Sequence, residues 1–140
     1  MDVDKMEAGR ELDALVAEKI MGWQLRDSMT DEIVTEDSDY REAAYNDGWH
    51  WDGRGGRLEA WQWQPSIDIV AAWEVVERLC ELPSVGIIIK AYPKWNEKHE
   101  RNFLYGYVAT FPDLGLQAVA DTAPLAICRA ALKAILNGNP

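Results

Sequence analysis

The sequence predicts an α+β protein in which helices pack on a mostly antiparallel sheet. The first observation behind this prediction is the strict alternation of residues 101–111, because a period of two residues is typical of a strand. The second is the recurrence of apolar residues at helical spacing in three segments, at 8–21, 66–80 and 125–136. No internal repeat is found, and a chain of 140 residues fits a single domain, so we expect residues 1–140 to form one domain.

The C-terminal part of the chain predicts a hairpin followed by a helix. Residues 112–115 contain the proline and glycine of a turn, and residues 116–120 return as the second strand of the hairpin. Residues 121–124 offer a capping side chain and then a proline in the first turn of a helix. The helix is expected to end where Gly138 follows its last apolar residues.

An N-terminal helix is predicted for residues 8–21, and Gly22 is expected to end it in the left-handed conformation. A second helix is predicted to begin at Ser66, which would serve as its N-cap, and to stop before Pro83. We expect the apolar stripe of this second helix to face the core, with Trp73 inside it. The stripe consists of Ile69, Val70, Trp73, Val76, Leu79 and Cys80. Cys80 and Cys128 are expected to be reduced core residues.

Two more strands are predicted between these elements. Residues 58–64 alternate, with Trp61 and Trp63 on one face, and residues 85–92 are rich in β-branched side chains, as a central strand is. Residues 93–100 are interpreted as a polar connection into the hairpin.

Residues 26–49 show no periodicity and predict an acidic loop or flap, with a short helix fitted to residues 38–45. The segment from Asp27 to Asp52 contains nine acidic residues and one basic residue, Arg41. Residues 1–64 contain 16 Asp and Glu against 7 Lys and Arg, so they carry most of the net charge of −10. This balance argues against nucleic-acid binding and is compatible with a basic partner, although a solvated surface also explains it.

Composition also bears on the cellular location. No apolar run reaches the roughly 18–20 residues that span a membrane, and residues 1–11 lack the pattern of a secretory signal. We therefore expect a cytoplasmic protein without a membrane partner.

Three stretches together resemble the phage ABA sandwich domain family, which consists of small proteins of phages and prophages. They are residues 8–24 (AGRELDALVAEKIMGWQ), residues 65–79 (PSIDIVAAWEVVERL) and residues 107–136, which contain ADTAPLAICRAALKA. The resemblance implies an α-β-α sandwich and a location in the cytoplasm of a bacterial host. It implies no reaction, and fold similarity by itself transfers no function.

The sequence lacks the motifs of common catalytic sites. No phosphate-binding loop of the form G-x-x-x-x-G-K-[ST] occurs, no serine lies in a G-x-S-x-G context, and neither His50 nor His99 belongs to a cluster with the spacing of metal ligands. We therefore predict a protein that is not an enzyme and that uses no metal and no cofactor.

A ligand-binding site is predicted where tryptophans and arginines gather. The segment Gly53 to Arg57 contains glycines beside Arg54 and Arg57, so it is interpreted either as a flexible turn or as an anion site. The aromatic face of the strand at 101–111 is either core or a stacking surface for a base. The predicted binding residues are Arg54, Arg57, Trp49, Trp51, Trp61, Trp63, Tyr105 and Tyr107.

Two functions follow from these features. The first is a phage accessory protein that binds and sequesters a small nucleotide-like signalling ligand of a bacterial defence system, without transforming it. The alternative is an acidic protein-interaction module that inhibits a host protein. Because a small domain with this much aromatic surface often buries it against a second copy, we also expect a homo-oligomer, most simply a C2 dimer.

Overall fold

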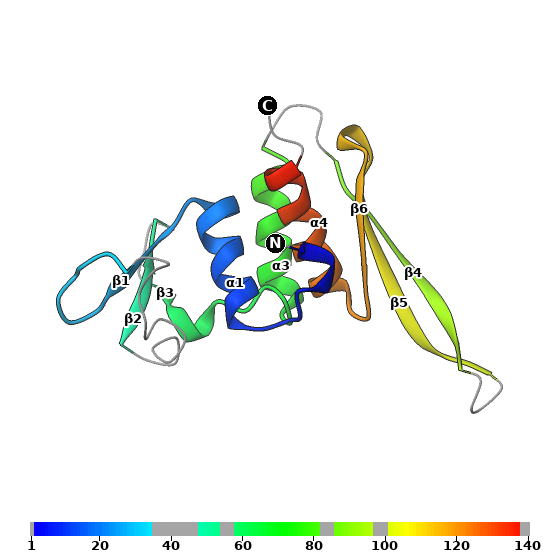
Figure 1. Ribbon diagram of the computed structural model, residues 1–140, viewed down its shortest axis with the longest axis horizontal. Coiled ribbons are helices and arrows are strands. Elements are labelled where there is room, and N and C mark those ends of the chain that lie inside the picture. The colour runs from blue at the N-terminus through cyan, green and yellow to red at the C-terminus, as the bar shows by residue number, and fades with distance from the viewer. Residues whose placement is uncertain (1, 35–47, 54–57, 82–85, 97–100, 138–140) are drawn as a thin grey trace.

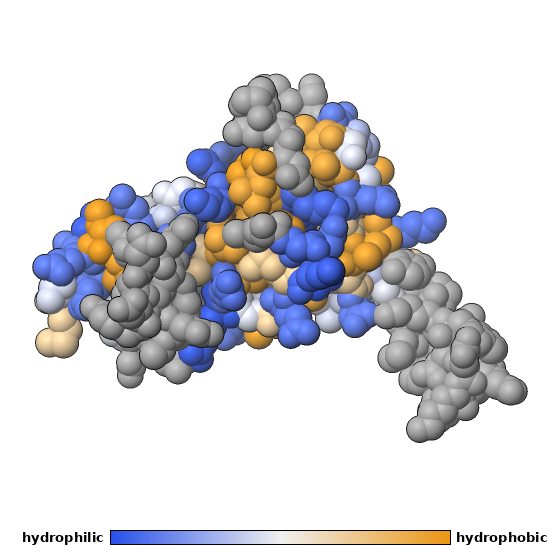
Figure 2. Space-filling view, viewed as in Figure 1, coloured by the Kyte–Doolittle hydropathy of each residue, from blue (hydrophilic) through white to orange (hydrophobic). Residues whose placement is uncertain are grey.

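The computed structural model describes residues 2–34, 48–53, 58–81, 86–96 and 101–137, with the backbone alone described for 92–96, 101–105 and 137. Helices occupy the middle of the molecule, and a three-stranded antiparallel sheet lies on either side of them (Figure 1). The expected α+β class is confirmed, and the strands are shared between two sheets. Hydrophobic surface in this view is seen mainly over the helical part, mixed with hydrophilic residues (Figure 2).

The longer sheet has the order β4-β5-β6 and confirms the predicted hairpin. Its strands are β4 (Ile88–Asn96), β5 (Arg101–Phe111) and β6 (Leu116–Ala120). The sequence predicted a polar connection from residue 93 onward, but residues 93–96 continue β4 and pair with β5, with a shift of register between Lys94 and Trp95. Pairing with a long neighbouring strand therefore overrides the polar local sequence.

Helix α4 (Ala123–Asn137) lies across the inner face of this sheet and contacts both α1 and α3. Its buried face is rich in alanine, as is the inner face of the sheet around Phe111. Small side chains on both surfaces let the helix and the sheet approach closely. The buried alanines are Ala126, Ala130, Ala131 and Ala134 on α4 and Ala109, Ala118 and Ala120 on the sheet.

The predicted N-terminal helix is shorter at its start and changes its hydrogen-bond pattern along its length. It consists of α1 (Arg10–Val16) followed by the π-helical turn η2 (Ala17–Met21). Gly22 ends it with a φ of 74°, which confirms the predicted left-handed stop. The other short helical segments of the described chain are η1 (Val3–Lys5), η3 (Ala60–Gln62) and η4 (Pro112–Leu114).

Helix α3 (Ile69–Leu79) differs from its prediction in its cap and in its buried face. Its N-cap is Asp68, whose side chain accepts a 3.0 Å hydrogen bond from the Val70 N–H, so the assignment of Ser66 as the cap is wrong. Trp73 and Cys80 are exposed, so the core positions predicted for them are also wrong. The residues that α3 does bury are Ala71, Ala72, Val75, Val76 and Leu79.

The smaller sheet has the order β1-β2-β3 and was missed by sequence patterns, because its strands are short. Its strands are β1 (Gln24–Asp27), β2 (Trp49–Asp52) and β3 (Leu58–Glu59). The strand predicted for residues 58–64 is wrong beyond Glu59, because the chain enters η3 there, held by a capping box between Glu59 and Gln62. The acidic segment thus begins and ends in paired strands, and residues 35–47, with the helix expected at 38–45, lie outside the described residues.

Two cationic side chains of α4 hold the N-terminal segment and β6 together. Arg129 donates hydrogen bonds of 2.7 and 2.9 Å to the Met6 carbonyl and one of 2.9 Å to the Val119 carbonyl. Lys133 donates a 2.8 Å hydrogen bond to the Gln117 carbonyl. Residues from the two ends of the chain therefore meet along β6.

Candidate functional site

The four clustered tryptophans do not share one environment. Trp49 and Trp51 lie in β2 and are buried, and Trp63, which follows η3, is buried as well. Trp61 lies within η3 and is 49% exposed. In a strand Trp61 and Trp63 would share a face, but the helical turn rotates one away from the other.

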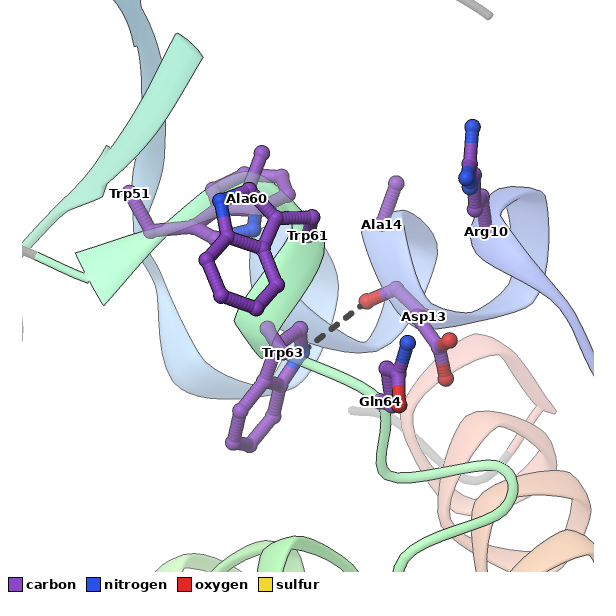
Figure 3. A pocket seen from close by; sticks show the side chains of 8 residues that line it. All are labelled: Arg10, Asp13, Ala14, Trp51, Ala60, Trp61, Trp63 and Gln64. Atoms are coloured by element: carbon purple, nitrogen blue, oxygen red, sulfur yellow. Dashed lines mark hydrogen bonds between the residues drawn. The ribbon is translucent and has the colours of Figure 1, made fainter. Parts of the chain in front are cut away.

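Trp63 is part of the packing between α1 and the smaller sheet. Its indole N–H donates a 3.1 Å hydrogen bond to the backbone carbonyl of Asp13, which Figure 3 shows as a dashed line. Its ring meets the Trp23 ring edge to face at a centroid distance of 4.7 Å. These contacts satisfy the polar atom of a buried indole, so the described contacts of Trp63 are structural.

A cavity of about 10 Å³ lies between these residues and α1. In Figure 3 the indoles of Trp51, Trp61 and Trp63 gather on one side of it, while the Arg10 side chain points away from them. A volume of this size holds about one water molecule. It is therefore too small to receive a nucleotide in the conformation described.

Asp13 is the buried carboxyl group of this region. Its side chain accepts a 2.8 Å hydrogen bond from the Ser66 N–H, and the Ser66 hydroxyl in turn accepts a 3.0 Å bond from the Gly9 N–H. Burial raises the pKa of Asp13 to about 6, while the hydrogen bonds from the Ser66 backbone and hydroxyl oppose the rise. Burial also raises the pKa of the Cys128 thiol, and the Asp13 charge adds to this effect.

These groups tie the segment before α3 to the start of α1. Ser66, predicted as a helix cap, instead joins two segments more than fifty residues apart in the sequence. The Asp13 carboxyl group is hydrogen-bonded to the backbone N–H and the hydroxyl of Ser66. We therefore assign this cluster a structural role.

The remaining predicted ligand residues are only partly described. Arg54 and Arg57 lie outside the described residues, and Tyr105 is described by its backbone alone, opposite Pro93 in the β4–β5 register. Tyr107 is half-buried and packs against the core. Ligand binding by this set stays a prediction.

The outer face of α3 carries a row of exposed apolar side chains beside a groove. The sequence analysis did not propose this face as a site. Ile69 is 49% exposed, Val70 69% and Trp73 47%. Together with Glu74 and Glu77 they line an open groove of about 370 Å³. We call the three apolar residues the α3 apolar strip. Ile67, which comes just before the helix, is exposed as well.

A sequence signal for this face exists in the spacing of the small residues. Ala71, Ala72, Val75 and Val76 repeat every three or four positions and form the buried row, while the larger Ile69, Val70 and Trp73 form a second row. The prediction was right to bury Val76 and Leu79 but wrong to place Ile69, Val70 and Trp73 in the core. Packing against the alanine-rich α4 favours the smaller side chains.

A second groove, of about 560 Å³, continues from the α3 apolar strip and is acidic. It is lined by Glu74 and Glu77, which also line the first groove, and by the Arg78–Glu81 ion pair, whose N–O distance is 2.8 Å. Its other lining residues are Met21, Trp23 and Gly53. Apolar and acidic surfaces thus meet on one helix.

Neither a cluster of metal ligands nor a membrane-spanning helix is found in the described part of the chain. No three His, Cys, Asp or Glu side chains within it come together as metal ligands would. None of its helices combines the length and the apolar character required to cross a bilayer.

Comparisons with known proteins place these features in a family context. The family model of the phage ABA sandwich domain matches residues 14–132. The chain is also similar to a solved structure of a phage protein from Bacillus cereus ATCC 14579, with 25% sequence identity, coverage of 91% of this chain and 92% of that chain, and a TM-score of 0.45. No curated protein matches it. The matched region runs from α1 into α4 and includes the whole of α3, and the chain belongs to the phage ABA sandwich domain family.

Proposed function

We propose that this phage protein acts by binding a protein partner stoichiometrically through the outer face of α3, without catalysing a reaction. The observation that carries the proposal is the α3 apolar strip, in which three adjacent apolar side chains, one of them a tryptophan, are each about half exposed or more. Exposed apolar side chains that form one patch with a polar rim are typical of interaction sites. Tryptophan in particular contributes large binding energies at protein interfaces.

The charge of the chain supports the same function. Glu74 and Glu77 border the strip, and the chain as a whole has a net charge of −10. A negative field accelerates the association of a basic partner and repels acidic ones. The proposed setting is the cytoplasm of the bacterial host, where binding would cover a basic surface of a host protein and inhibit it.

A photo-crosslinking experiment tests this function. A photoreactive phenylalanine analogue replaces Val70, which is the most exposed residue of the strip, in the full-length protein produced in infected host cells. The same analogue replaces the exposed Gln117 of β6 as a matched control. We expect a discrete adduct from position 70 that is lost when Trp73→Ser is added, and none from position 117. Equal adducts from both positions, or none from position 70, contradict the proposal.

The second candidate function is the sequestration of a nucleotide-like defence signal. It is supported by the half-exposed ring of Trp61, whose exposed face would stack on a base, and by two arginines nearby in the sequence, Arg54 and Arg57. The test is a thermal-shift panel of cyclic nucleotides and ADP-ribose derivatives, with Trp61→Ala and Arg57→Ala as variants. A ligand that stabilises the wild type but neither variant supports sequestration. If no compound of the panel raises the melting temperature of the wild type, this function is contradicted.

A further inference from the structure

The α3 apolar strip has the dimensions of a site for one short row of partner side chains. Ile69, Val70 and Trp73 occupy positions i, i+1 and i+4 of the helix, so their backbone spans only about 6 Å along its axis. Ile67 extends the apolar surface beyond the start of the helix. A strip this short along the helix axis suits the apolar face of one helix or extended segment better than a broad, flat surface.

Carboxylates lie at both ends of this strip. Asp68 precedes it as the N-cap of α3, and Glu74 and Glu77 follow it in the shared wall of the two grooves. The lining of the acidic groove also includes Glu81, which pairs with Arg78. Among the described residues, the N-cap of α3 and the linings of the two grooves hold four carboxylates and one guanidinium, so a complementary partner carries cationic residues beside its apolar ones.

The same charges argue against a second copy of this chain as the occupant. In a twofold contact the same patch meets itself, so Glu77 of one copy would face the acidic surface of the other. Each copy also carries a net charge of −10. Like charges that meet in an interface oppose association, and no cationic residue of α3 other than Arg78 is present to offset them.

We propose that the outer face of α3 binds a basic amphipathic segment of a partner protein. Its apolar side chains lie on Ile69, Val70 and Trp73, and its Lys or Arg residues lie over Glu77 and the acidic groove. The inference rests on the proposed protein-binding function and adds the chemistry of the partner to it. Trp73 is the anchor of the contact, since it is the largest of the exposed side chains in the strip.

Amide NMR titration of the full chain tests the partner chemistry with synthetic peptides at physiological salt. The probe is a short amphipathic helix of leucine and lysine. One control peptide replaces every lysine with glutamate, and a second keeps the lysines but replaces the leucines with serine. We expect saturable shifts confined to α3 and to the Trp73 indole N–H with the leucine–lysine peptide, and no comparable shifts with either control.

Variants then separate the apolar and the charged contributions. Val70→Ser and Trp73→Ser are each expected to weaken binding tenfold or more, which is the size of a hot-spot effect. Glu77→Gln is expected to weaken binding severalfold at low salt and less at high salt. The matched control is Ile88→Ser, because Ile88 is an apolar residue of comparable exposure that lies at the start of β4, outside the α3 apolar strip, and the variant should leave the affinity unchanged.

The outcomes distinguish this inference from the function on which it rests. Shifts that map away from α3, or equal binding of the glutamate peptide, overturn the basic-segment proposal. A position-70 adduct without any peptide binding leaves the protein-binding function in place and shows that its partner is not a basic segment. A dimer in light scattering that Val70→Ser converts to a monomer identifies the occupant as a second copy, as the sequence analysis expected, and overturns the proposal.

Discussion

Trp23 and Trp63 pack edge to face, with ring centroids 4.7 Å apart and ring planes inclined by 61°. One ring follows the end of η2 and the other follows η3, so the pair joins the N-terminal helix to the smaller sheet. The Trp63 N–H bonds the Asp13 carbonyl on the same side of the molecule. A residue predicted to bind ligand is therefore engaged in packing.

Replacing Trp63 with phenylalanine should destabilise the fold. The variant removes one of two donors to the Asp13 carbonyl, which keeps its helical hydrogen bond from the Ala17 N–H; this loss costs about 0.5–1.5 kcal/mol, and the weakened aromatic pair is worth about 0.5–1.5 kcal/mol. We expect the free energy of unfolding to fall by about 1–3 kcal/mol in urea denaturation followed by circular dichroism. Trp61→Phe is the control, and a change within about 0.5 kcal/mol is expected for that half-exposed ring.

Asp13 should make the folded state more stable at acid pH than at neutral pH. Its pKa of about 6 in the folded protein lies above its ordinary value of about 3.9, so the folded state binds the proton more tightly. This contribution is fully present below about pH 4 and is lost as the pH rises through about 6. Over this range it amounts to about 3 kcal/mol.

The Asp13→Asn variant isolates this effect, because asparagine keeps an oxygen for the Ser66 N–H but does not titrate. We expect the free energy of unfolding of the variant, relative to wild type, to rise by about 3 kcal/mol between pH 4 and pH 7. Ser66→Ala is a second test, since loss of the hydroxyl removes a group that lowers the pKa of Asp13. In Ser66→Ala the pH at which the Asp13 contribution to stability is lost should therefore be higher than in the wild type. A constant difference between Asp13→Asn and wild type at all pH values would show that Asp13 titrates normally.

Gly53 should not tolerate a side chain. Its φ is 128°, and a Cβ atom there would lie 2.9 Å from Cδ1 of Trp23. Gly53→Ala therefore combines backbone strain with a clash and should cost about 1–3 kcal/mol in thermal or urea unfolding. Gly86→Ala is the matched control, because no atom lies within 4 Å of its added Cβ, and equal losses in the two variants would contradict the argument.

The two cysteines should differ sharply in reactivity. Cys80 is exposed, whereas Cys128 is buried and has a raised thiol pKa. Because the thiolate is the reactive form, an aromatic disulfide reagent at neutral pH should modify one thiol quickly and the other only after unfolding. Cys80→Ser should abolish the fast phase. Rapid modification of both thiols in the native protein would be incompatible with a buried Cys128.

The parts of the fold that the sequence predicted are those fixed by local patterns. The strands at 101–111 and 116–120 follow from alternation and a turn, and the helix stop at Gly22 follows from its left-handed backbone. The sequence does not predict β1 and β2 as strands, since four residues are too few for a clear period and their pairing joins distant segments.

The candidate site was harder to predict, because it depends on which of two apolar rows a helix buries. On α3, packing against the alanines of α4 determines which row is buried, and these alanines lie about fifty residues further along the chain. The role of Trp63 likewise depends on the carbonyl of Asp13, fifty residues earlier. Neither partner is visible in a local window of sequence.

The side chains of Arg129 and Lys133 also affect how the molecule meets other copies of itself. β6 is the outermost strand of its sheet, and edge strands invite pairing with strands of other chains. An incoming strand would compete with Arg129 and Lys133 for the carbonyls of Val119 and Gln117 and would have to displace the N-terminal segment bound at Met6. The β6 edge of the sheet is in this way protected against growth into fibres.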